Sequence, residues 1–176
     1  MKYNHVGAMA SALDSLADSC FDDLPLVARD VARGVTRMFF RAEMFALCEA
    51  PLPNGRRADM MAITAKGELV IVEIKVSRAD LMGDGKWTDY LDYCDRFFWA
   101  VPSGFDLSPF DGGCLGDDCA GLIVADRYDA AVIREAPLRP LAAARRKAET
   151  LRFARRAARR LAGDLDPSLA GLASFD

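Results

Sequence analysis

The sequence NGRRADMMAITAKGELVIVEIKV (residues 54–76) decides the fold, because it contains two turn signals and a strand of almost unbroken apolar residues. The Asn-Gly pair at 54–55 is typical of a tight hairpin turn, and the Lys-Gly pair at 66–67 predicts a second one. The segment after the second turn opens with Glu68 and is otherwise apolar apart from Glu73 and Lys75, which predicts a strand buried on both faces in the middle of a sheet. The predicted strands of this meander span residues 44–52, 57–65 and 68–76.

Helices and shorter strands are predicted on both sides of the meander. Apolar residues recur at helical spacing before it and again near the end of the chain. Gly34 is unusual inside the first of these helices, where a glycine costs about 1 kcal/mol relative to alanine. The order of elements predicts an α/β fold in which helices flank one sheet. The predicted elements are helices at 23–42, 86–93 and 140–162, strands at 96–101, 122–125 and 131–133, and loops at 77–85 and 102–120.

The length and composition are those of one globular domain. The chain has 176 residues, of which 52% are hydrophobic and 28% are charged, and this profile excludes a disordered or fibrous protein. No apolar run approaches the roughly 20 residues needed to span a bilayer, and the N-terminus lacks the apolar core of a secretory signal, so no membrane partner is expected. We expect an N-terminal extension at 1–22, a single domain at 23–162 that includes a basic C-terminal helix, and a tail at 163–176.

The cysteines and the histidine limit the kinds of metal site and catalytic site that the chain can form. Five scattered cysteines in a chain without a secretory signal favour reduced thiols and a cytoplasmic location. Cys114 and Cys119 are separated by four residues and have no second cysteine pair or histidine nearby, so they predict a surface loop rather than a zinc site. The single histidine, His5, lies near the N-terminus, which excludes a histidine-dependent triad.

The net charge of −3 conceals a strong separation of charge along the chain. Residues 139–160 contain nine arginines and lysines against one acid, Glu149, so the remainder is acidic. A basic segment of this kind is typical of a surface that binds a polyanion. The alternative is a basic helix face that is simply solvated.

The two turns bring three acids toward one point of the sheet. Glu73 and Lys75 are two residues apart in a strand and therefore project from the same face. Counting outward from the turns in antiparallel register sets Asp59 opposite Glu73 and Glu49 opposite Asp59. A register shifted by one residue would move a side chain to the other face, so the arrangement depends on the turns being assigned correctly.

Three clustered carboxylates repel one another, and burying them without compensation costs several kcal/mol each. One lysine cannot neutralise three acids, whereas Mg²⁺ or Mn²⁺ prefers hard oxygen ligands of this kind. The alternative is an ion pair between Lys75 and either Glu73 or Asp59 that serves only the fold.

The order Arg57-Ala58-Asp59 followed by Glu73-Ile74-Lys75 resembles the signature of the PD-(D/E)xK nuclease superfamily. Longer segments resemble the MmcB-like bacterial DNA repair proteins, whose proposed activity is that of an endonuclease, and the similarity covers roughly residues 23–162. These segments are PLPNGRRADMMAI (51–63), VIVEIKVSRADLMGDGKWTDYLDYCDRFFWAVP (70–102), GLIVADRY (121–128) and LAAARRKAETLRFARRAARRL (141–161).

The resemblance implies a role for each matching residue. Asp59 and Glu73 correspond to the two metal-binding carboxylates, Lys75 to the catalytic lysine, and the backbone carbonyl of Ile74 to a further metal ligand. Ala58 stands where the superfamily's name has proline, at a position that commonly varies.

Many relatives add an acid from the first helix, for which Asp30 is the candidate here. Glu49 competes for that place from the neighbouring strand, and the hairpin geometry favours Glu49.

The resemblance further implies a restriction-endonuclease-like central mixed sheet, with a single PD-(D/E)xK nuclease-like domain. The implied function is DNA repair by an Mg²⁺- or Mn²⁺-dependent endonuclease that hydrolyses phosphodiester bonds through a metal-activated water. The implied substrate is branched, damaged or single-stranded DNA. The predicted DNA contacts are Arg56, Arg57, Lys86, Tyr90, Arg145, Arg146, Lys147 and Arg152.

Two alternatives stay open at this point. One is a catalytically silent module of the same fold that binds nucleic acid or a repair partner, and the other is a nuclease directed at RNA. The DNA structure recognised, endo- or exonucleolytic action, the number of metal ions and the oligomeric state, a homodimer included, are not determined by the sequence.

Overall fold

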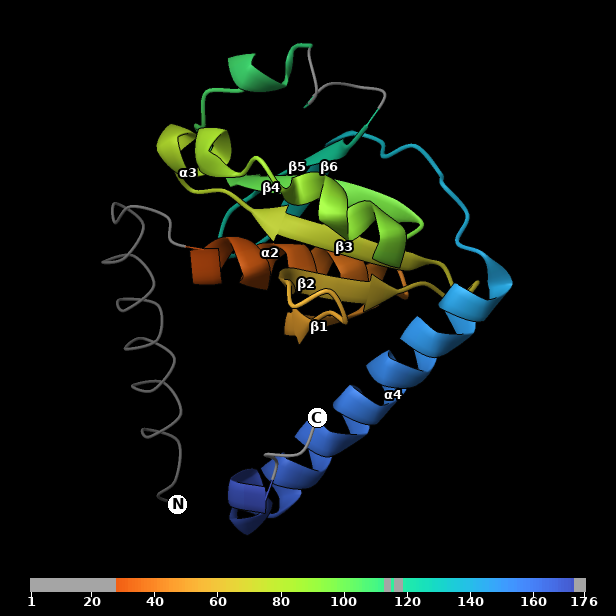
Figure 1. The fold of residues 1–176 in the computed structure, drawn as a ribbon. Helices are drawn as coiled ribbons and strands as arrows, with labels where there is room; N and C mark the ends of the chain where they lie inside the picture. The colour runs from red at the N-terminus through yellow and green to blue at the C-terminus, as the bar shows by residue number, and fades with distance from the viewer. Residues whose placement is uncertain (1–27, 113–114, 116–118, 173–176) are drawn as a thin grey trace, which may run out of the picture.

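The computed structural model describes residues 28–112, 115 and 119–172 (Figure 1). It confirms the mixed α/β architecture, and each strand lies within two residues of its predicted bounds. The elements in chain order are α2 (Ala28–Arg41), β1 (Phe45–Pro51), β2 (Arg57–Ile63), β3 (Leu69–Ile74), α3 (Arg78–Gly83), the 3₁₀ helix η1 (Trp87–Tyr93), β4 (Arg96–Pro102), the 3₁₀ turn η2 (Ser108–Phe110), β5 (Gly121–Ala125), β6 (Ala130–Arg134), α4 (Ala143–Leu165) and the 3₁₀ helix η4 (Pro167–Leu172).

The six strands form one sheet in the order β1-β2-β3-β4-β5-β6. The first three are antiparallel, β3, β4 and β5 run parallel, and β6 is antiparallel to β5. Both predicted turns hold their register, because Cys48 pairs with Met60 and Met60 pairs with Val72. β3 is buried along its whole length, as expected for a central strand.

The sheet separates two apolar layers. Helix α2 covers one face, where Val31 and Val35 pack with Val70 and Val72 of β3. On the other face η1 contributes aromatic side chains that pack around Trp99. Residues of β3 alternate between these layers, so Glu73 and Lys75 lie on the face opposite α2.

Gly34 is explained by the close approach of α2 to the turn between β5 and β6. A Cβ atom at this position would overlap the backbone carbonyl oxygens of Asp126 and Asp129. The glycine therefore lets the helix pack on the turn, and this gain offsets its low helix propensity. The predicted start of this helix, at 23–27, lies outside the described residues.

We expect Gly34→Ala to lower the free energy of unfolding by about 1–3 kcal/mol, because backbone atoms cannot move aside as a side chain can. The matched control is Gly163→Ala in α4, where an added Cβ meets no atom within 4 Å. There the better helix propensity should raise stability by up to about 1 kcal/mol. Urea unfolding of both variants measures the difference, and equal effects would contradict the packing explanation.

Asp95, at the start of β4, ties the sheet to the start of α4. Its carboxylate accepts hydrogen bonds from the backbone N–H groups of Leu69 at 2.8 Å and Leu141 at 2.9 Å. The Arg146 guanidinium binds the same carboxylate with bonds of 2.7 and 2.5 Å and also donates to the Gly67 carbonyl at 3.0 Å. From this joint α4 runs past the edge strand β1, where Arg156 donates to the Pro51 carbonyl (Figure 1).

Two sequence predictions need correction here. The segment predicted as a loop at 77–85 contains the helix α3, and the helix predicted at 86–93 is the 3₁₀ helix η1. Most of the segment between Cys114 and Cys119 lies outside the described residues, so the predicted loop there is not described. Within the described part of the chain, no helix has both the length and the apolar character needed to cross a membrane.

Candidate active site

Asp59 and Glu73 lie side by side where the regular pairing of β2 and β3 ends. The ladder runs as far as Met60 and Val72, and beyond it the carboxylates take the place of backbone acceptors. The Asp59 backbone N–H donates to Glu73 Oε1 at 3.1 Å, and the Ile74 backbone N–H donates to Asp59 Oδ2 at 2.8 Å. Each acid is therefore held by the strand that carries the other, as the turn register predicts.

Glu49 does not join this pair, although the register of its flanking residues Cys48 and Ala50 places it opposite Asp59. Its backbone has a φ of 54°, in the left-handed region that favours glycine. Its carboxylate lies 2.5 Å from the Arg57 guanidinium, and its side chain is half exposed. The expected cluster of three carboxylates is therefore reduced to two in this structure.

Lys75 lies beside the two carboxylates and is held by acids that the sequence did not indicate. Its side chain is 8% exposed, and its Nζ lies 2.8 Å from Asp84 Oδ2 and 3.8 Å from Asp80 Oδ1. The same nitrogen lies 5.6 Å from the centre of the Trp99 ring, within the range of a cation–π contact. Lys75 thus has its own counter-charges and is not the ion-pair partner of Glu73.

Asp80 and Asp84 reach Lys75 because the chain after β3 turns into α3. Ser77 caps this helix, since its hydroxyl accepts a hydrogen bond from the Asp80 backbone N–H at 3.1 Å. The sequence does contain this signal, because serine followed three residues later by an acid is a helix-start pattern. The helix was not predicted because Gly83 and Gly85, on either side of Asp84, are typical of a loop.

Burial changes the acidity of the central groups. It raises the pKa of Glu73 to about 8, and the charge of Asp59 adds to the effect. Burial also raises the pKa of Asp59, against the opposing influence of the Ile74 N–H group and Lys75. For Lys75, burial works to lower the pKa, but Asp84 and the other nearby acids outweigh it and the pKa is raised. Lys75 is therefore an ammonium ion at neutral pH, beside a pair of acids that resists carrying two negative charges.

Tyr90, a predicted DNA contact, lies close enough to Glu73 and Asp59 to be influenced by their charges. It is buried on η1, and its hydroxyl donates to the Arg57 carbonyl at 3.3 Å. Burial raises the pKa of Tyr90, and the charges of Glu73 and Asp84 raise it further, so the phenol stays protonated and can donate a hydrogen bond. Lys86 is exposed at the residue before η1.

The two arginines of the β1–β2 turn already have acidic partners. Arg56 binds one oxygen of Asp89 through two nitrogens, at 3.1 and 2.8 Å. Arg57 binds Glu49, as described above. A phosphate contact by either arginine therefore requires an exchange of ion pairs.

Asp30 lies on α2, on the other face of the sheet, and its carboxylate is 3.7 Å from the Arg127 guanidinium. None of the contacts described around Asp59 and Glu73 includes it. The structure therefore does not bring Asp30 to the candidate site.

The predicted DNA contacts on α4 divide into two groups. Arg146 is bound to the buried Asp95 and anchors the helix, and its contact with DNA stays a prediction. Arg145 and Arg152 flank the buried Glu149 at 3.9 and 2.5 Å, and Arg145 also lies 4.8 Å over the Tyr93 ring. Lys147 is exposed.

The donor set at the centre is compatible with a hard divalent cation. In the described part of the chain, no three side chains of histidine, cysteine, aspartate or glutamate are grouped as a complete metal site. Mg²⁺ does not require such a group, because it is usually held by one or two carboxylates and keeps several waters. Asp59 and Glu73 provide two adjacent carboxylates whose negative charge is resisted by burial, and a cation would relieve that cost.

Comparison with known proteins agrees with this architecture. The model of the MmcB-like family, described as "DNA repair protein MmcB-like", matches residues 17–168. The structure is similar to that of the SPO1766 protein of unknown function from Silicibacter pomeroyi, with 40% identity and a TM-score of 0.72, over 84% of this chain and 95% of that one. No curated protein matches the chain. The chain therefore belongs to the MmcB-like family of DNA repair proteins.

Proposed function

We propose that this chain is a metal-dependent nuclease with a restriction-endonuclease-like fold, which hydrolyses phosphodiester bonds of DNA during repair. The observation that carries the proposal is the mutual bonding of Asp59 and Glu73 directly beside the buried ammonium group of Lys75. Membership of a DNA repair family supports DNA as the substrate class. The order of the three residues along two adjacent strands is that of the PD-(D/E)xK signature.

The charges argue against an ion pair that serves only the fold. In that case Lys75 would neutralise Glu73 or Asp59, whereas its nitrogen contacts Asp84 and Asp80. Lys75 therefore offsets only part of the negative charge of the central pair, and a proton or a cation would balance the rest. A cation at this position has a chemical use, because phosphate oxygens can complete its coordination.

Asp59 and Glu73 would hold Mg²⁺ or Mn²⁺, and the backbone carbonyl of Ile74 is the proposed further ligand. When bound, such an ion polarises a phosphoryl oxygen and lowers the pKa of water. Glu49 lies close enough to influence the pKa of Asp59, so release of Arg57 would make its carboxylate available to the same ion.

Lys75 contributes as a charged donor in this proposal. Because its pKa is raised, the ammonium group does not accept a proton from water at neutral pH. Its role is to donate hydrogen bonds to phosphate oxygens and to stabilise the charge that develops on them. Asp84 and Asp80 hold its nitrogen in place, and the Tyr90 hydroxyl donates to the Arg57 carbonyl beside the site.

The test is a cleavage assay with the purified full chain on single-stranded, branched and damaged DNA, in Mn²⁺ and in Mg²⁺. Asp59→Asn and Lys75→Met should each reduce cleavage by at least about 10²-fold, because the first weakens binding of the metal ion and the second removes the donor to the phosphate. The control is Glu135→Gln, which neutralises an exposed acid outside the site and should cleave like the wild type. Equal cleavage by wild type and Asp59→Asn would refute the site assignment.

Two further measurements distinguish the proposed nuclease from a binding module and from a nuclease directed at RNA. A binding module without catalysis would bind DNA but show no cleavage with either ion, and it need not gain thermal stability from Mn²⁺. A nuclease directed at RNA would be inhibited more strongly by an RNA competitor than by DNA of the same sequence. Either result would replace the proposed activity.

A further inference from the structure

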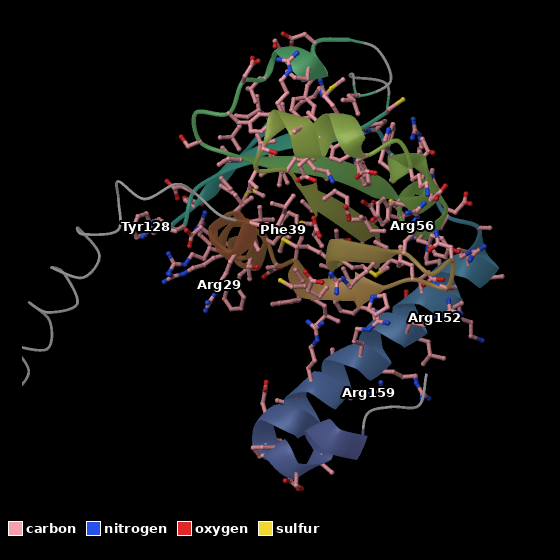
Figure 2. The ribbon with its side chains drawn as sticks, turned by 60° about the vertical axis from the view of Figure 1, so that its left-hand side comes forward. Arg29, Phe39, Arg56, Tyr128, Arg152 and Arg159 are labelled. Carbon is pink, nitrogen blue, oxygen red and sulfur yellow. The ribbon has the colours of Figure 1, made fainter. Side chains whose placement is uncertain are left out.

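A groove of about 520 Å³ lies between α4 and the turn that joins β1 to β2. One wall is the apolar turn at 51–55, and the other consists of Arg152, Arg155, Arg156 and Arg159. Figure 2 shows Arg152 and Arg159 on α4, with Arg56 on the neighbouring part of the sheet. The groove is therefore next to the strand that carries Asp59, although no predicted DNA contact except Arg152 lines it.

The arginines of this groove share one face of α4 because they are spaced three, four and seven residues from Arg152. Residues 150–163 contain five arginines and no acid. Of the two acids that flank this stretch in the helix, Glu149 is buried between Arg145 and Arg152, and Asp164 follows its end. The stretch at 150–163 therefore carries an excess of positive charge.

Two arginines of the same region fix the helix against the edge of the sheet. Arg156 donates to the Pro51 carbonyl at 3.0 Å. Arg160 donates to the Cys48 carbonyl and, at 3.4 Å, to the Glu49 carbonyl. These bonds use carbonyl groups of the edge strand β1 and attach the helix beside the turn. Arg155 and Arg159 line the groove beside these two anchored arginines.

We infer that this groove binds the phosphodiester backbone of the DNA strand that enters the active site, with Arg155 and Arg159 contacting phosphates. The inference rests on the proposed function and names a binding surface for its substrate. Guanidinium groups bind phosphate oxygens in pairs of parallel hydrogen bonds, and the apolar turn opposite them suits the sugar.

The dimensions favour a polyanion over a single anion. Arg152 and Arg159 are seven residues apart, which corresponds to roughly 10 Å along a helix. The turn at Gly55 is four residues from Asp59, or roughly 13 Å along a strand. In duplex DNA this length corresponds to about four nucleotides of one strand. A strand lying in the groove would thus present successive phosphates to α4 and later ones to the carboxylates.

The experiment measures binding without cleavage, so that it does not depend on catalysis. Fluorescence anisotropy with labelled single-stranded and duplex oligonucleotides in EDTA gives the affinity between 50 and 200 mM salt. The variant is Arg155→Ala with Arg159→Ala, and alanine preserves the helix. We expect at least about 10-fold weaker binding and a slope of log K against log salt that is reduced by about 1.4–1.8.

The matched control removes the same charge from another helix. Arg29→Ala with Arg33→Ala changes two exposed arginines of α2, which lies away from α4 in Figure 2, and should keep the wild-type salt slope. Arg155→Lys with Arg159→Lys retains the charge and should also keep most of the slope. Equal slopes for the two alanine variants, or no DNA binding by the wild type, would overturn the inference.

A poly-glutamate competitor of matched charge tests an acidic protein as the occupant. Equal competition by poly-glutamate and by DNA would overturn the assignment to nucleic acid. A wild type that binds DNA through these arginines but never cleaves it would refute the proposed nuclease while leaving the groove assignment intact. A wild type that cleaves DNA, with binding unaffected by loss of Arg155 and Arg159, would refute only the groove.

Discussion

Glu73→Gln is expected to raise the free energy of unfolding at pH 9 by up to about 5 kcal/mol and to change it little at pH 4. The reason is the pKa of Glu73, which burial raises from 4.5 to about 8. Between these values the folded protein holds a proton that the unfolded chain has released, so the wild type loses stability as the pH rises. Glutamine does not titrate, and its carbonyl oxygen can still accept the hydrogen bond from the Asp59 backbone N–H.

The measurement is urea unfolding of wild type and variant at several pH values without divalent ions. An exposed acid elsewhere provides the control, and Glu43→Gln should shift the curve by a constant amount. A difference between wild type and Glu73→Gln that stays constant from pH 4 to pH 9 would contradict the raised pKa. Addition of Mn²⁺ at pH 9 should stabilise the wild type more than the variant, if the carboxylate pair holds the ion.

Asp95→Asn is expected to lower the free energy of unfolding by about 3–5 kcal/mol, because it leaves the Arg146 guanidinium without its buried partner. Burial alone would raise the pKa of Asp95, but hydrogen bonds from Arg146, Leu141 and Leu69 outweigh it and lower the pKa. A lowered pKa stabilises the fold above the unfolded value near 3.8. This contribution is lost as the pH falls through the folded value, so the difference between wild type and variant should shrink in acid.

A double-mutant cycle with Arg146→Gln isolates the coupling between the two residues. The exposed ion pair of Arg41 and Asp129 is the matched comparison, and Arg41→Gln should cost less than about 1 kcal/mol. Similar losses for Asp95→Asn and Arg41→Gln would show that the joint between β4 and α4 contributes no more than a surface pair.

The sequence predicts the sheet and the pairing of Asp59 with Glu73, because both follow from the positions of two turns. The turns at 54–55 and 66–67 set the register of both hairpins, and the observed partners of Met60 agree with the count from each turn. Because the register follows from turn position alone, Asp59 and Glu73 could be placed together without knowledge of the rest of the fold.

The contacts that the sequence did not indicate have three different causes. Arg146 resembles every other cation of its helix in sequence, and only the approach of Asp95, 51 positions earlier, makes it an anchor. Glu49 departs from the expected cluster because one residue of β1 takes a left-handed backbone, which neither composition nor spacing indicates. The contact of Asp84 with Lys75 was not predicted, because the glycines on either side of Asp84 indicate a loop. The serine at position 77 does predict the start of a helix there.

The turn at Lys66 and Gly67 also constrains how the gene can change. Gly67 has a φ of 76°, and a Cβ atom added there would meet no atom within 4 Å. The turn therefore has the open surroundings of a surface loop, where insertions and deletions are usually tolerated. Gain or loss of a single codon there would move Asp59 to the other face of the sheet, or shift it along β3, and so separate it from Glu73. Substitutions at position 66 should therefore be tolerated among relatives, whereas the number of residues in this turn should not vary.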